Sequence, residues 1–268
     1  MIIGRSNTIL GLLPALLIAP LVQADTTLTM KDLVGTQDAL IEVRGHMVKM
    51  SQPGQPEYML YDTRRNIGIH VSTADKEYME IDQATIAGFA DSVNAMKAQF
   101  APQIQVMREQ LKNLPPEQRA MLEKSMGGMV NLGAMESQPV ENVTTVKRGS
   151  DKISGFTCDR YDVMSDKERV ADMCLATEAG AGMSKDDFAT LRKMMKFMRE
   201  MASSAQKLSS DLGGPQIVMG DADGVPVAMK DFKYGHEYQV SGVSDASLDS
   251  ARFSEYQAFA RKTLPALR

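Results

Sequence analysis

The sequence of 268 residues contains no tryptophan, only two cysteines and only three histidines. So few cysteines and histidines leave little material for a zinc cluster or a haem attachment site. The sequence also lacks a serine nucleophile motif, the paired histidines of HExxH and a Gly-rich phosphate loop. We therefore expect no cofactor, no metal centre built from these residues and no enzymatic activity.

An excess of positive charge is missing as well, because 30 Lys and Arg residues stand against 34 Asp and Glu residues, a formal net charge of −4. Binding to nucleic acid depends on a basic face that displaces counterions from the phosphates. The composition, 43% hydrophobic and 24% charged, is that of a folded soluble protein and not of a disordered chain. We expect no nucleic-acid partner.

The first 24 residues have the pattern of a secretory signal peptide. A single positive charge at Arg5 precedes an apolar stretch over residues 8–22, and Val22-Gln23-Ala24 has the pattern of a cleavage site before Asp25. The stretch is shorter than a transmembrane helix and contains two prolines. No cysteine follows the cleavage site, and no second run of spanning length occurs. We expect an exported protein that begins at Asp25, carries no lipid and does not span a membrane.

Short segments rich in aromatic and β-branched residues predict strands through most of the remaining chain. Between Glu57 and Asp82 three such segments are separated by brief polar turns, which is typical of an antiparallel meander. The predicted strands are residues 38–44, 47–51, 57–62, 67–72, 77–82, 140–148, 155–164, 169–176, 216–219, 225–232 and 237–244.

Two helical insertions interrupt the strands, at about residues 83–127 and 184–208. In the first, apolar residues recur at helical spacing from Ile86 to Leu111, Pro102 predicts a kink, a shorter helix spans 117–126 and a loose loop follows. Ser184 and Asp187 form a capping box at the start of the second. The apolar stripe of the second helix comprises Phe188, Leu191, Met195, Met198, Ala202 and Ala205, flanked by Met194, Met201 and Leu208.

The two cysteines, Cys158 and Cys174, are expected to form a disulfide because an exported protein matures in an oxidising compartment. If Cys158 lies opposite Cys174, the hairpin turn centres on Asp166 and Arg160 faces Asp172, a favourable cross-strand charge pair. Two pairings therefore agree on one register.

Methionine is unusually frequent, with 21 residues. One cluster comprises Met121, Met126, Met129 and Met135, and a second comprises Met194, Met195, Met198 and Met201. Three interpretations stay open: ordinary core packing, a deformable lining for an apolar ligand or partner, and a copper(I) site, since thioethers are soft ligands. Neither cluster has a histidine or cysteine beside it in the sequence.

Two further features suggest sites only at first sight. Asp221-Ala222-Asp223-Gly224 begins like a calcium loop, but position 12 of such a loop is Phe232 and not the required glutamate, so a hairpin turn is expected. His46, His70 and His236 lie in a turn, in a strand and at a strand start, and no catalytic partner is near any of them in the sequence.

The order of these motifs resembles an exported bacterial family, domain of unknown function 4412. The matching segments are EYMLYD, EYMEID, LPPEQRAMLEKSMGG, GFTCDRYDV, ADMCLA, MSKDDFATLRKMMKFMREM and GVPVAMKDFKYGHEYQVSGVSDASLDSARF. The family is similar in outline to periplasmic lipoprotein carriers. The resemblance implies a Gram-negative periplasm and an open, strongly curved antiparallel sheet, a half-barrel with helices on its concave face. It implies no activity.

We therefore expect one α+β domain over residues 25–268, with its two helical insertions covering the concave face of a lipoprotein-carrier-like sheet. Our first hypothesis is a non-enzymatic periplasmic protein that binds a lipid, an acyl chain or an apolar partner segment, lined by Phe188, Leu191, Met195 and Met198. The alternative is a methionine-rich protein that handles copper or responds to stress. A structural or accessory protein without a ligand is the third. The sequence does not determine the oligomeric state.

Overall fold

The computed structural model describes residues 25–35, 37–92, 143–212 and 221–263, together with positions 95, 98, 99 and 102. The predicted signal peptide, the helix over 117–126, the loop that follows it and the strand over 216–219 lie outside the described residues. Only the start of the first helical insertion, residues 83–92 and the four positions after them, is described as helix.

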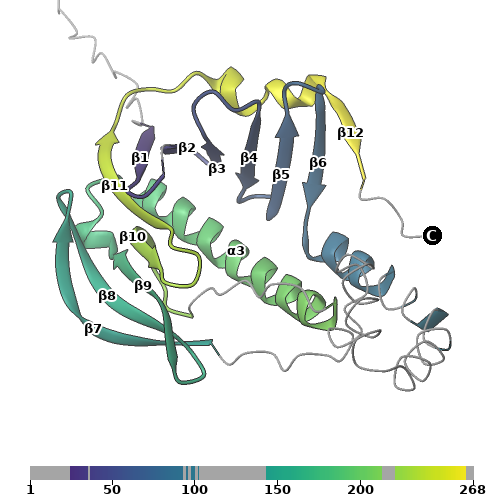
Figure 1. Cartoon of the computed structure of the whole chain (residues 1–268). Coiled ribbons are helices and arrows are strands. Elements are labelled where there is room, and N and C mark those ends of the chain that lie inside the picture. The colour runs from purple at the N-terminus through teal and green to yellow at the C-terminus, as the bar shows by residue number, and fades with distance from the viewer. Residues whose placement is uncertain are drawn as a thin grey trace, which may run out of the picture.

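The described residues form an α+β fold around one open sheet of 12 strands (Figure 1). Neighbouring strands are antiparallel except β12, which pairs parallel to β6. Across the sheet the order is β12-β6-β5-β4-β3-β2-β1-β11-β10-β9-β8-β7. The strands are β1 (Thr26–Asp32), β2 (Ala39–Arg44), β3 (Met47–Ser51), β4 (Glu57–Asp62), β5 (Ile67–Ser72), β6 (Glu77–Ile81), β7 (Val143–Ile153), β8 (Phe156–Ser165), β9 (Glu168–Ala176), β10 (Val225–Asp231), β11 (Glu237–Ser244) and β12 (Ala260–Lys262).

The long helix α3 (Lys185–Leu212) lies across the concave face of the sheet and contacts β2, β3 and β10 (Figure 1). It starts as expected at Ser184, whose hydroxyl accepts a hydrogen bond of 3.1 Å from the backbone N–H of Asp187. The Asp187 carboxylate accepts a hydrogen bond of 2.7 Å from the Thr26 hydroxyl, which ties the helix start to β1. Burial raises the pKa of this carboxyl group.

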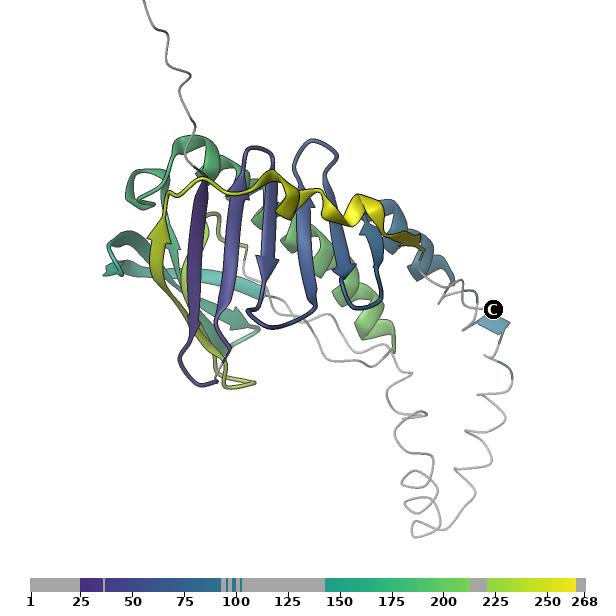
Figure 2. The same ribbon diagram turned by 90° about the horizontal axis from the view of Figure 1, so that it is seen from above.

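The opposite face of the β2–β5 region is covered by a C-terminal segment that contains the 3-10 helices η2 (Ser250–Phe253) and η3 (Glu255–Ala258). Figure 2 shows this segment crossing the strands on the side away from α3. Phe253 and Tyr256 pack there with Leu60 and Ile69 in a second hydrophobic cluster. Because a strand points alternate side chains to opposite faces, β4 and β5 contribute to both layers.

The predicted strands agree closely with those observed. The strands expected at 57–62, 67–72 and 237–244 have the bounds of β4, β5 and β11, whereas β7 extends to Ile153, beyond its expected end. The sequence reasoning missed β1, β12 and the C-terminal segment. Among the described residues, no helix is long and apolar enough to cross a membrane.

Candidate functional site

An apolar groove lies between the middle of α3, from Met194 to Ala202, and strands β3–β6. It has a volume of about 340 Å³, at the small end of the range of about 300–1,000 Å³ for ligand pockets. We call it the methionine groove. Its lining residues are Met50, Met59, Leu60, Tyr61, Gly68, Ile81, Ile86, Met194, Phe197, Met198, Met201 and Ala202.

The groove depends on a glycine in β5. Phe197 of α3 packs over Gly68, and a Cβ at that position would lie 3.3 Å from the phenyl ring. The same ring contacts Tyr61, with 4.9 Å between the ring centroids. Since Gly68 carries no side chain, the aromatic ring can approach the sheet closely at this point, while Met194, Met198 and Met201 flank it along the helix.

None of the described residues that line the groove is charged, and Tyr61 is the polar one among them. The Tyr61 hydroxyl donates a hydrogen bond of 2.8 Å to the side-chain oxygen of Asn66. Burial, together with the nearby negative charges of Glu200 and Asp62, raises the pKa of Tyr61, so the phenol stays neutral. The lining therefore has the chemistry of hydrocarbon and thioether groups.

The four side chains expected to line an apolar site lie in different places. Met198 lines the groove. Phe188 and Leu191 lie in the main hydrophobic core, with exposed fractions of 4% and 0%, and Met195 packs against that core. The apolar stripe thus marks residues that pack against the sheet, and of the four expected side chains Met198 alone lines the methionine groove.

The methionine clusters of the sequence are only partly described. Met121, Met126, Met129 and Met135 lie outside the described residues. From the second cluster, Met194, Met198 and Met201 reach the groove, where Met50 of β3 and Met59 of β4 join them. The contribution of β3 and β4 was missed because these methionines are distant from the cluster in the sequence.

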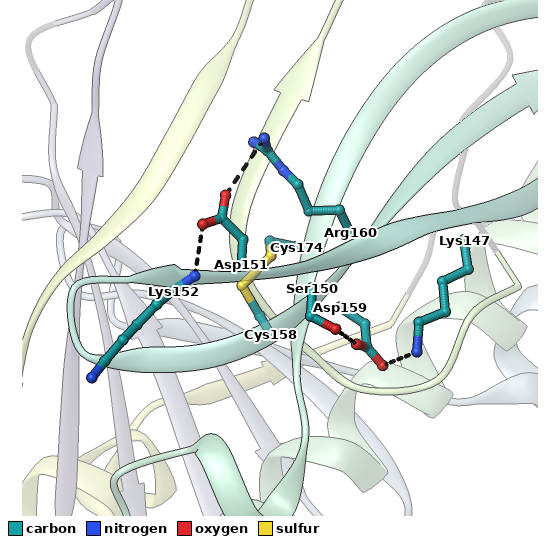
Figure 3. Close-up of a disulfide and its surroundings, with 8 residues drawn as sticks. All are labelled: Lys147, Ser150, Asp151, Lys152, Cys158, Asp159, Arg160 and Cys174. Carbon is teal, nitrogen blue, oxygen red and sulfur yellow. Dashed lines mark hydrogen bonds and ion pairs between the residues drawn. A yellow bond between two sulfur atoms is a disulfide. The ribbon is translucent and has the colours of Figure 1, made fainter.

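The disulfide between Cys158 and Cys174 is confirmed, with a Cα–Cα separation of 5.4 Å (Figure 3). Its predicted register is wrong. Cys158 pairs with Ala176 and Cys174 with Arg160, so the disulfide joins positions that are offset in the ladder. The turn pairs Ser165 with Glu168, one position away from the predicted register, and a bulge between Val163 and Met164 shifts the pairing by one position more.

The predicted charge pair of the hairpin is wrong for the same reason. Asp172 lies opposite Asp162, and Arg160 instead forms an ion pair of 3.5 Å with Asp151 of β7. Asp159 accepts hydrogen bonds from Lys147, at 2.6 Å, and from the Ser150 hydroxyl, at 2.7 Å (Figure 3). Both faces of the β7–β8 ribbon are therefore organised by polar pairs around a disulfide that ties β8 to β9.

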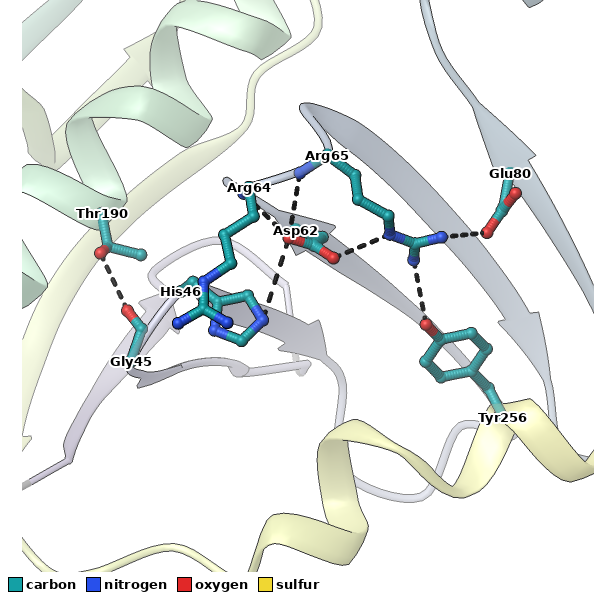
Figure 4. A network of polar contacts seen from close by, with 8 residues as sticks. All are labelled: Gly45, His46, Asp62, Arg64, Arg65, Glu80, Thr190 and Tyr256. Atoms are coloured by element: carbon teal, nitrogen blue, oxygen red, sulfur yellow. Dashed lines mark hydrogen bonds and ion pairs between the residues drawn. The ribbon is translucent and has the colours of Figure 1, made fainter.

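A second, polar pocket lies between the β2–β3 and β4–β5 turns and the C-terminal segment, with a volume of about 520 Å³. Asp62 accepts hydrogen bonds from the Arg65 guanidinium, at 2.8 Å, and from the Arg64 backbone N–H, at 2.9 Å (Figure 4). Burial acts to raise the pKa of Asp62, but these hydrogen bonds outweigh it and the pKa is lowered. Arg65 also binds Glu80, at 2.7 Å.

The charges of this polar pocket compensate one another. His46 lies 4.0 Å from the Asp62 carboxylate, and the Tyr256 hydroxyl accepts a hydrogen bond of 3.2 Å from Arg65 (Figure 4). The carboxylates of Asp62 and Glu80 are balanced by Arg65 and by Arg261, which lies 2.6 Å from Glu80. We interpret the network as the attachment of the C-terminal segment to the sheet.

The Asp221–Gly224 segment has no calcium-loop geometry. Asp221 accepts a hydrogen bond from the Thr145 hydroxyl, and Asp223 binds the Arg192 guanidinium. Within the described residues, no three side chains of His, Cys, Asp or Glu gather in a way that would hold a metal ion. The strand expected to precede this segment lies outside the described residues.

Three comparisons place the chain among known proteins. A family model described as "Domain of unknown function (DUF4412)" matches residues 96–255. Curated proteins give no significant match. A solved structure titled "Structure of PNGF-II in C2 space group" is similar with a TM-score of 0.43 and 5% sequence identity, over 90% of this chain and 31% of that chain. The chain thus spans about a third of the length of that structure, and a likeness at this level says nothing about activity.

Proposed function

The chain belongs to the family described as domain of unknown function 4412, and on that premise we propose that it is a non-enzymatic binding protein that holds an apolar ligand in the methionine groove. The ligand class is an acyl chain, free or attached to a lipid or a lipidated partner. The observation that carries the proposal is the groove lining, in which five methionines and Phe197 surround open space and no described lining residue is charged.

The lining suits flexible chains of varied shape. Methionine is unbranched and polarizable, so its side chain adapts to different ligand outlines better than leucine does. Each methylene that leaves water contributes about 0.8 kcal/mol. About ten buried methylenes would give about 8 kcal/mol before the cost of immobilising the chain. We expect dissociation constants in the micromolar range or weaker.

The fold supports a carrier-like mode of action. An open curved sheet with a helix along its concave face places the groove between the two layers, where a ligand is shielded from water on both sides. We propose that the protein works as the periplasmic lipoprotein carriers do, by keeping an acyl chain out of water. The lining residues that the structure describes include no serine, cysteine, histidine or carboxylate that would serve catalysis.

We also propose that the protein is exported to the periplasm through cleavage after Ala24. The cleavage pattern before Asp25 supports this, and so does the disulfide between Cys158 and Cys174, which oxidising compartments favour. Mass spectrometry of the purified protein is expected to give a chain that begins at Asp25 without acylation. An intact N-terminus or an added lipid would contradict the proposal.

The binding proposal is tested by titration with a fluorescent fatty-acid probe. The wild-type protein is expected to raise the probe's emission to saturation. Met198→Glu is expected to abolish binding at concentrations that saturate the wild type, because a charged carboxylate in an apolar site excludes the acyl chain. Met198→Leu, which keeps the groove apolar, is expected to retain it.

The matched control is Ala189→Glu, which adds the same charge at an exposed position of the same helix. It is expected to bind the probe like the wild type, while circular dichroism shows that both glutamate variants are folded. The proposal fails if the wild type leaves the emission unchanged at saturating protein. It also fails if the folded Met198→Glu variant binds as well as the control.

A further inference from the structure

A row of soft side chains crosses four neighbouring strands. Met50 of β3 lies opposite Met59 of β4, Met59 opposite His70 of β5, and His70 opposite Met79 of β6. Directly opposed residues of antiparallel strands point to the same face, with Cβ atoms about 4.5–5.5 Å apart. Three thioethers and one imidazole therefore stand side by side, and we call them the Met/His row.

The row lies on the same face of the sheet as α3 and is open to solvent. Met50 and Met59 belong to the lining of the methionine groove, and with His70 they also line an adjoining shallow depression of about 320 Å³. All four side chains are partly exposed. A metal ion in solution can therefore reach the row without opening the core.

The composition of the row selects a particular kind of cation. Thioethers are soft ligands that favour copper(I), and imidazole also binds copper, whereas Ca²⁺ and Mg²⁺ require oxygen ligands. Among the described residues no cluster of three acidic, histidine or cysteine side chains would compete for a harder ion. Met50 and Met79 are three strands apart, about 14 Å at the usual strand spacing, and would not both reach one ion. We propose that His70, with Met59 and Met79 directly beside it, forms a binding site for copper(I).

One neighbouring carboxylate fits this assignment. The Nε2 atom of His70 lies 3.6 Å from a carboxylate oxygen of Glu57, which precedes Met59 by two residues on the same face of β4. Metal-binding histidines commonly direct their second ring nitrogen to a carboxylate, which fixes the ring orientation. Glu57 would hold Nε2 in this way and leave the other ring nitrogen of His70 for the metal.

The copper site goes beyond the binding of an apolar ligand and is separable from it. Met59 is shared with the methionine groove, but His70 and Met79 are not part of the groove lining. A variant with both His70→Leu and Met79→Leu therefore removes two ligands of the row and leaves the groove intact. Met173→Leu, in β9 and partly buried, is the matched control for loss of a methionine elsewhere.

The test is an anaerobic titration of the disulfide-bonded protein with copper(I) against a chromophoric chelator. The double variant is expected to bind at least about ten-fold more weakly than the wild type, since even the loss of a residue behind a metal ligand has that effect. Met173→Leu is expected to match the wild type, and X-ray absorption is expected to show sulfur and nitrogen ligands.

The single variant Met79→Leu changes the side-chain volume little, so it is expected to fold even if the double variant does not. It is expected to weaken copper binding as well. The proposal is overturned if the folded double variant retains wild-type affinity for copper(I), which would place any bound copper on other methionines. It is also overturned if the wild type does not bind. The fatty-acid probe, measured on the same double variant, is expected to bind normally, so failure of one proposal is distinguished from failure of the other.

Discussion

Replacing Cys158 by serine is expected to lower the free energy of unfolding by about 2–5 kcal/mol, the usual effect of losing a native disulfide. The disulfide links β8 to β9 across 16 positions of the sequence. Both cysteines are 1% exposed and belong to the main core that packs against α3. Part of the expected loss comes from the denatured chain, which becomes less restricted, and part from a hydroxyl buried among apolar side chains.

Urea unfolding followed by circular dichroism measures this loss, and the wild type unfolded in the presence of a reductant provides the control. Reduction and Cys158→Ser are expected to shift the midpoint to a similar extent, since each removes the same covalent link. Oxidised wild type and variant that unfold at the same urea concentration would contradict the prediction. So would two reactive thiols in the non-reduced, denatured wild type.

Leu191→Ala is expected to cost about 2–5 kcal/mol of stability, because truncating a buried leucine leaves a cavity. Leu191 is 0% exposed and lies where α3 meets the sheet in the main core. It does not line the methionine groove. The variant is therefore expected to unfold earlier but to bind the fatty-acid probe with wild-type affinity while it is folded.

Met198→Ala, on the same helix, is expected to have the opposite pattern of effects on stability and on probe binding. Met198 is partly exposed and lines the groove, so its truncation is expected to weaken probe binding and to change stability less than Leu191→Ala does. Denaturation and probe titration of the two variants separate the effects. Parallel losses of stability and of affinity in both variants would show that the core and the groove are not distinct parts of the helix surface.

Local patterns explain why much of the sheet could be predicted. In β4 and β5 alternate residues meet α3 and the C-terminal segment, and both segments are rich in aromatic and β-branched residues. Periodicity and the Ser184 cap likewise located α3. Each of these signals lies within a short stretch of the chain, so the secondary structure of that stretch can be predicted without knowing its partners in the fold.

What could not be predicted depends on contacts between distant segments. The 3-10 helices that place Phe253 and Tyr256 over the sheet have no regular apolar period. The turn after Ser165 and a bulge near Val163 each shift the register around the disulfide by one position. The methionine groove depends on the close contact between Gly68 and the ring of Phe197. The sequence of β5 alone does not predict that a side chain of α3 packs there.

The Met/His row could not be predicted from the sequence for the same reason. Met59, His70 and Met79 are each separated by a full hairpin, and only the register of the strands brings them together. The sequence suggests copper binding by the methionine clusters of α3 and of residues 121–135. The pairing of the strands instead favours a site on the sheet.

The most direct test of ligand binding in the methionine groove is NMR of protein labelled with ¹³C at the methionine methyl groups. The protein is titrated with dodecanoic acid below its micelle concentration, and signals are assigned by Met→Leu variants. The methyl signals of Met194, Met198 and Met201 are expected to shift to saturation. Met47, which packs in the second cluster beneath the C-terminal segment, and Met173 of β9 are expected to stay unchanged. Saturating acid that shifts none of the groove methionines, or that shifts only Met47 or Met173, would contradict the account.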